Sequence, residues 1–97
     1  MTRNKNNSIE MREIRKKIDK VDTKILPLIV KRSELVNKAL SLKKRKSDIV
    51  DTKRINQIKK KVSSQAKKLG ANQKLISNIW LSMIKNFIEF EKKNFKK

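Results

Sequence analysis

The feature that most constrains this sequence is a long apolar heptad seam near its N-terminus. Between residues 14 and 43, apolar side chains recur at alternating steps of four and three, as in a helix packed against another helix. Arg32 occupies a position in this seam where the pattern calls for an apolar residue. Because an unpaired buried charge costs several kcal/mol, we expect an anionic group to meet this arginine. The apolar members of the seam are Ile14, Ile18, Val21, Ile25, Leu28, Leu35, Ala39 and Leu42.

A second stripe of residues runs beside the seam and carries further cations. On one helix, Arg32 and Lys43 would lie three turns apart, about 16 Å along the axis. This span suits an elongated ligand with an anion at one end, or a groove along the helix. The alternatives are an ion pair between Arg32 and an acidic residue of a partner helix, and a solvated face for Arg15, Lys43 and Arg54. The second stripe consists of Arg15, Asp22, Ile29, Val36 and Lys43.

The seam predicts an unusually long first helix. This helix should begin near Ile9 and run to about Lys46, a length of roughly 57 Å. A compact chain of 97 residues has a radius of gyration of about 13 Å, so its own chain cannot cover such a helix. We therefore expect a second copy to bury the seam. Pro27 should kink this helix without ending it, because the apolar period continues in phase on both sides.

Local signals predict two further helices. Asp51 is a suitable N-cap for the second helix, Gly70 is a suitable C-cap for the same helix, and Asn72 can cap the third. The sequence contains neither strand patterns nor internal repeats, which favours an all-α fold of three helices. We predict a single helical domain over residues 9–97, preceded by a disordered tail over residues 1–8.

The third helix combines aromatic residues with one acidic residue on its apolar stripe. Trp80, Phe87 and the neighbouring aliphatic residues are predicted to form the core. Glu91 falls on the same stripe. It marks either the point where the helix frays or a buried group that, when protonated, could donate a hydrogen bond to an anionic ligand.

The composition excludes several kinds of site and partner. The chain has neither cysteine nor histidine, which removes thiolate chemistry, the commonest general base and the commonest metal ligand. It has no signal peptide, and no apolar run in it is long enough to span a membrane. We therefore expect a cytoplasmic protein. The formal charge of +19 would attract any polyanion, so a nucleic-acid-binding helical dimer is an alternative. Nucleic acid is the less favoured partner, because aromatic residues are few and no docking motif is present.

These residues resemble the all-helical chorismate mutases along nearly the whole chain. The first helix carries that family's pattern in Arg15, in the segment Ile18-Asp19-x-Val21-Asp22, in Arg32 and in Lys43. The stretches VDTKRI and NIWLSMIKNFIEFEKKNF resemble the start of the family's second helix and its third helix. The resemblance implies an intertwined homodimer that rearranges chorismate to prephenate, a step towards phenylalanine and tyrosine. This intramolecular [3,3] rearrangement needs no metal and no cofactor.

The resemblance also implies roles for individual residues towards a dicarboxylate substrate. Arg15 would reach the active site of the other subunit, and Arg32 would bind one substrate carboxylate. Lys43 would contact the ether oxygen and a carboxylate, while Glu91 would donate a hydrogen bond to the same oxygen. Catalysis would then depend on Lys43, Glu91 and Arg32. The full substrate-binding set would be Arg15, Arg32, Lys43, Asp51, Arg54, Ile55, Phe87 and Glu91.

The chain departs from the chorismate mutase pattern at three places. The loop between Lys43 and Asp51 is shorter than the common pattern, Ile55 replaces a glutamate, and Phe87 replaces a small polar residue. The two apolar replacements are similar to isochorismate pyruvate-lyases of the same fold. Conversion of isochorismate to salicylate and pyruvate is therefore an alternative reaction. Binding of a chorismate-like ligand without turnover is another alternative.

Overall fold

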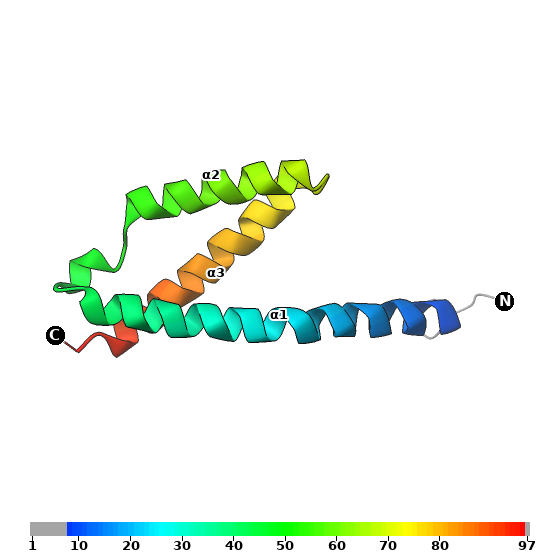
Figure 1. Cartoon of the computed structure of the whole chain (residues 1–97), viewed down its shortest axis with the longest axis horizontal. Coiled ribbons are helices and arrows are strands. Elements are labelled where there is room, and N and C mark those ends of the chain that lie inside the picture. Colours follow the sequence, from blue (N-terminus) through cyan, green and yellow to red (C-terminus); the bar gives the residue numbers. More distant parts are fainter. Residues whose placement is uncertain (1–7, 97) are drawn as a thin grey trace. The chain divides into compact units, whose positions relative to one another are not determined.

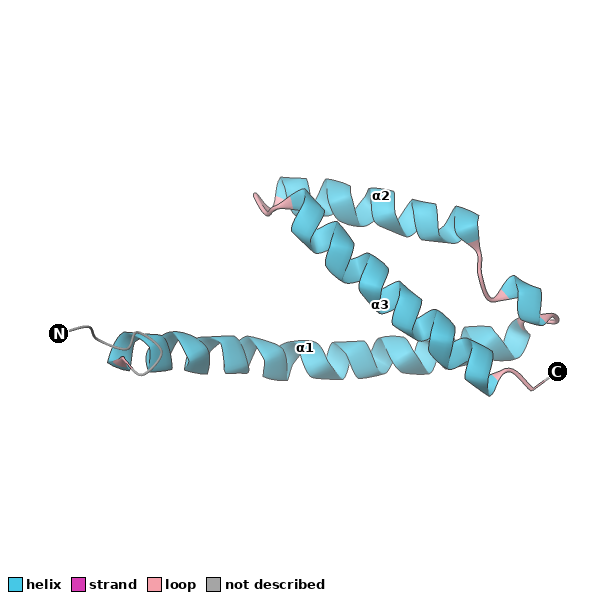
Figure 2. Ribbon diagram, turned by 180° about the vertical axis from the view of Figure 1, so that it is seen from behind, coloured by secondary structure: helices cyan, strands magenta, loops and turns pink. Residues whose placement is uncertain are grey.

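The computed structural model describes residues 8–96, and within them the chain is helical (Figure 1). The elements are α1 over Ile9–Leu42, the short 3-10 helix η2 over Lys46–Asp48, α2 over Thr52–Lys68 and α3 over Gln73–Asn94. Residues 8–96 contain no strand, as the secondary-structure colouring of Figure 2 also shows, so the predicted all-α class is confirmed. Apart from Ser8, the tail predicted over residues 1–8 lies outside the described residues.

Helix α1 begins where the sequence predicted and ends earlier. The Ser8 Oγ accepts a hydrogen bond from the Met11 N–H at 3.0 Å, so the serine caps the first turn. The helix continues through Pro27, which confirms the predicted continuity. Its predicted extension to Lys46 is wrong. The Lys43 N–H bonds to the Leu40 carbonyl at 3.1 Å, a tightened final turn after which the chain leaves the helix.

The chain divides into two compact units, residues 1–35 and residues 36–97. The described part of the first unit is the larger part of α1. The apolar members of the heptad seam in this unit are exposed, by between 45% at Ile25 and 69% at Leu28. This exposure agrees with the expectation that the chain does not cover its own seam.

The second unit is built around the packing of α2 on α3. Asp51 caps α2 by accepting the Arg54 N–H at 3.0 Å, and Asn72 caps α3 by accepting the Leu75 N–H at 2.9 Å. Gly70 adopts a φ of 70° in the turn between the two helices, the left-handed conformation that a glycine takes at a helix C-terminus. All three predicted signals are thus confirmed.

The buried residues of the chain are few, and those in α3 only partly follow the prediction. Ile84 is buried, whereas Trp80 and Phe87 are half-buried. Ile79, predicted to belong to the core, is 51% exposed, because the apolar stripe of α3 is wider than the surface that this chain covers. The buried apolar residues are Leu40, Ile49, Val62, Ala66 and Ile84.

Candidate functional site

The connection between α1 and α2 positions the first functional side chain, Lys43. This connection is held by a local contact in which Asp48 accepts the Arg45 N–H at 3.2 Å and pairs with the Arg45 guanidinium at 3.6 Å. Ile49, at 3% exposure, anchors the same segment in the interior. Because polar and apolar contacts both restrain the connection, the position of Lys43, its first residue, is well defined.

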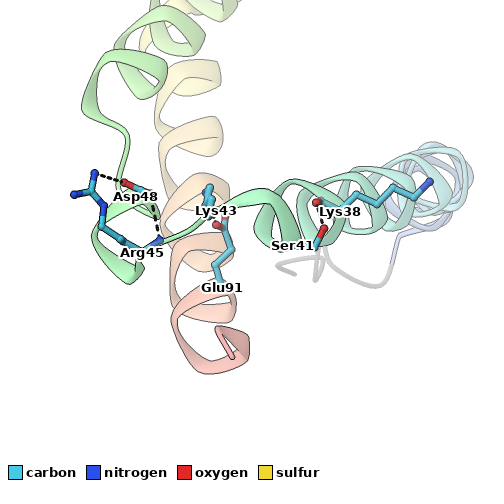
Figure 3. A network of polar contacts seen from close by, with 6 residues as sticks. All are labelled: Lys38, Ser41, Lys43, Arg45, Asp48 and Glu91. Carbon is cyan, nitrogen blue, oxygen red and sulfur yellow. Dashed lines mark hydrogen bonds and ion pairs between the residues drawn. The ribbon is translucent and has the colours of Figure 1, made fainter. Parts of the chain in front are cut away.

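Lys43 and Glu91 form the central contact of the site (Figure 3). The Lys43 Nζ donates to the Glu91 Oε2 at 2.6 Å, and this contact joins the connection to α3. The Glu91 side chain retains 9% of its exposure and the Lys43 side chain 23%. The alternative that Glu91 marks a fraying helix end is wrong, since α3 continues to Asn94 and Glu91 is buried. A short, charge-assisted contact with little solvent can hold both groups in place for a ligand.

An open hollow of about 600 Å³ lies at the connection and includes Lys43 in its wall. Asp51 also lines the hollow, and its carboxylate is engaged as the N-cap of α2. Arg54, in the first turn of α2, is exposed. The wall consists of Leu42, Lys43, Lys44, Ser47, Asp48, Val50, Asp51 and Thr52.

The two apolar departures from the family pattern are half-buried side chains on different helices. Ile55 lies in the first turns of α2, and Phe87 lies one turn before Glu91 on α3. Neither side chain can supply the hydrogen bond that a glutamate or a small polar residue would offer. Any ligand part that meets them encounters an apolar surface.

The remaining predicted residues, Arg15 and Arg32, belong to α1 in the unit of residues 1–35. Arg15 is exposed and Arg32 is half-buried. Of the predicted set, the structure therefore brings Lys43 and Glu91 into contact and places Asp51 with Lys43 in one hollow.

Sequence reasoning missed Lys44 and Asp48, which also line the hollow. Two signals could have found them. One is the uninterrupted basic run from Lys43 to Lys46, and the other is the spacing of Arg45 and Asp48, which suits an ion pair. Both signals lie in a segment that was assigned partly to the first helix.

Within residues 8–96, no group of three or more acidic residues gathers closely enough to hold a metal ion. No helix in that part of the chain combines the length and the apolar character required to cross a membrane.

The fold and the site define a class: an all-helical protein in which a part-buried lysine–carboxylate contact joins two segments beside a polar hollow. Comparison with known families makes this class specific. The family model described as chorismate mutase type II matches residues 14–92, which include every predicted site residue. The chain belongs to the chorismate mutase type II family. A search of curated proteins gave no match.

Proposed function

We propose that this protein is a chorismate mutase that rearranges chorismate to prephenate. The observation that carries the proposal is the 2.6 Å contact between Lys43 and Glu91. These two residues are the ones that the family resemblance assigns to the ether oxygen of the substrate. They are distant in sequence, yet their side chains converge on one point.

The reaction requires little from a protein besides positioning and electrostatics. The substrate must be held in a folded conformer, and negative charge that develops on its ether oxygen must be stabilised. In this proposal, Arg32 and Arg15 clamp the two carboxylates, with Arg15 supplied by a second copy of the chain. Arg54 adds positive potential near the ring.

Lys43 and Glu91 would act together on the ether oxygen. An ammonium group has three donors, so Lys43 can keep one for Glu91 and offer another to the substrate. Glu91 accepts from Lys43 in the ligand-free chain. Glu91 would donate to the ether oxygen in its protonated form, since an ionised carboxylate can only accept.

The proposed active unit is a homodimer. The support is the exposed seam of α1, in which Val21 is 53% exposed and Leu28 69%. An apolar face of this length, interrupted at Arg32, is unfavourable in water and is suited to pairing with a second copy of itself. Light scattering coupled to size-exclusion chromatography should give twice the mass of the chain. Replacement of Val21 by lysine should shift the protein towards monomer and remove turnover.

The proposed reaction is tested by incubating the purified protein with chorismate and identifying the products by chromatography. Prephenate should form, and Arg32→Ala should abolish its formation while the helical circular dichroism spectrum remains unchanged. A protein that is folded and dimeric but produces no prephenate would contradict the proposal.

A second reaction, cleavage of isochorismate to salicylate and pyruvate, is favoured by one specific observation. Ile55 and Phe87 present half-buried apolar surface where the mutase pattern has polar groups. A parallel incubation with isochorismate distinguishes the two reactions. Salicylate and pyruvate with little prephenate would assign the lyase activity, and Ile55→Glu should then reduce that activity.

A further inference from the structure

The hollow beside Lys43 is surrounded by more positive charge than the proposed catalytic residues supply. Lys44 lines the hollow directly, and Lys46 opens the 3-10 helix that leads to Ser47, another residue of its wall. Both lysines are exposed. The wall itself holds two lysines and two aspartates, so the balance of charge around the hollow depends on the neighbouring side chains. An excess of positive charge around a hollow raises the local concentration of an anionic ligand.

The acidic residues of this hollow do not cancel that charge. Asp48 is paired with Arg45, and the charge of Asp51 is balanced by the exposed Lys53 and Arg54 in the first turn of α2. Within residues 8–96, Lys44 and Lys46 take no part in the ion pairs Lys16–Glu13, Lys43–Glu91 and Arg45–Asp48.

Lys43 itself is poorly placed to attract a ligand from a distance. Its ammonium group lies 2.6 Å from the Glu91 carboxylate, so the pair has little net charge when seen from solvent. The long-range attraction at the hollow must therefore come from its exposed neighbours.

We infer that Lys44 and Lys46 capture the dianionic substrate at the hollow before it engages Lys43. This inference rests on the proposed function and deepens it by assigning entry of the substrate to the connection between α1 and α2. The two lysines are capture residues and not catalytic ones, so they raise kcat/KM and leave kcat unchanged.

The test compares wild type with the double variant Lys44→Gln/Lys46→Gln at two ionic strengths. Two charges about 10 Å from a dianion give a decrease in kcat/KM of about five- to tenfold at 0.01 M salt and about twofold at 0.15 M salt. The value of kcat should stay the same. The variant Lys44→Arg/Lys46→Arg, which keeps both charges, should restore the wild-type kcat/KM.

Two lysines at the far end of α2 provide a matched control. Lys67 and Lys68 occupy the last turn of α2, about 22 Å along the helix from Thr52 at the hollow. Lys67→Gln/Lys68→Gln removes the same net charge, and it should change kcat/KM by less than about twofold at 0.01 M salt.

The outcomes separate this inference from the proposed function. An active wild type with equal losses in the two double variants would overturn the inference, because only total charge would then matter. Unchanged kcat/KM in Lys44→Gln/Lys46→Gln would overturn it as well. Wild-type protein that is inactive on both chorismate and isochorismate would remove the proposed function, and the inference with it.

Discussion

Removal of the Glu91 carboxylate should destabilise the protein, because it leaves the ammonium group of Lys43 in a largely desolvated position. The two side chains are 9% and 23% exposed, so water replaces only part of the lost contact. Two unit charges 4 Å apart attract by about 4 kcal/mol at an effective dielectric constant of 20, and desolvation offsets much of this attraction. We therefore expect Glu91→Ala to lower the free energy of unfolding by about 1–3 kcal/mol.

A double-mutant cycle isolates the contribution of the contact itself. Lys43→Ala, Glu91→Ala and the double variant should give a coupling energy of about 1–2 kcal/mol. The free energies come from urea-induced unfolding followed by circular dichroism. The protein concentration must be the same throughout, since association would change the apparent stability.

The exposed pair formed by Lys16 and Glu13 provides the control for this cycle. Its atoms are 3.6 Å apart and its side chains are 71% and 59% exposed. Such a pair should give a coupling energy of no more than about 0.5 kcal/mol. A coupling energy for Lys43 and Glu91 as small as that of the control pair would refute the reasoning, because burial would then add nothing to the contact.

Three further predictions concern single positions. Glu91→Gln keeps a hydrogen-bond donor at the ether oxygen, so it should retain more turnover than Glu91→Ala, which steady-state assays of the two variants will show. Asp51→Ala should cost about 1 kcal/mol of stability through loss of the cap, whereas Asp51→Asn should retain it in urea unfolding. Gly70→Ala should cost about 1 kcal/mol from backbone strain alone, since no atom lies within 4 Å of an added Cβ, and Gly70→Asn should cost less in thermal unfolding.

The helix caps were predictable from sequence because each depends on a short-range interaction. Asp51 and Asn72 each accept from a backbone N–H three positions ahead, and Gly70 provides a left-handed residue directly after Leu69, the C-cap of α2. Such signals are independent of the rest of the fold, so the starts of α2 and α3 were assigned correctly.

The end of α1 was not predictable in the same way. The basic run after Leu42 contains no glycine or proline, and lysine and arginine are good helix formers. The helix ends because Lys43 bonds to the Leu40 carbonyl and because Asp48 engages Arg45. These contacts compete with the helical conformation, and the sequence gives only a weak indication of them.

The contact between Lys43 and Glu91 is a tertiary feature that periodicity could not predict. The two residues are 48 positions apart, and periodicity shows which face of α3 holds Glu91 without showing what meets it. The family resemblance named both residues, whereas their contact is visible only in the structure. The exposure of Ile79 was unpredictable for the same reason, because the apolar stripe of a helix does not show which segment packs against it.

The burial of Ile49 limits how often the connection between α1 and α2 can leave its packed position. To leave its packed position, the connection must expose this side chain, which costs about 1.5–3 kcal/mol in apolar hydration. The displaced form would then account for between about 0.6% and 7% of the molecules at equilibrium. Backbone amides around Ile49 should accordingly exchange with solvent deuterium through a local opening, well before the helices unfold. A single isoleucine in the connection thus sets how often the segment that carries Lys43 leaves its packed position.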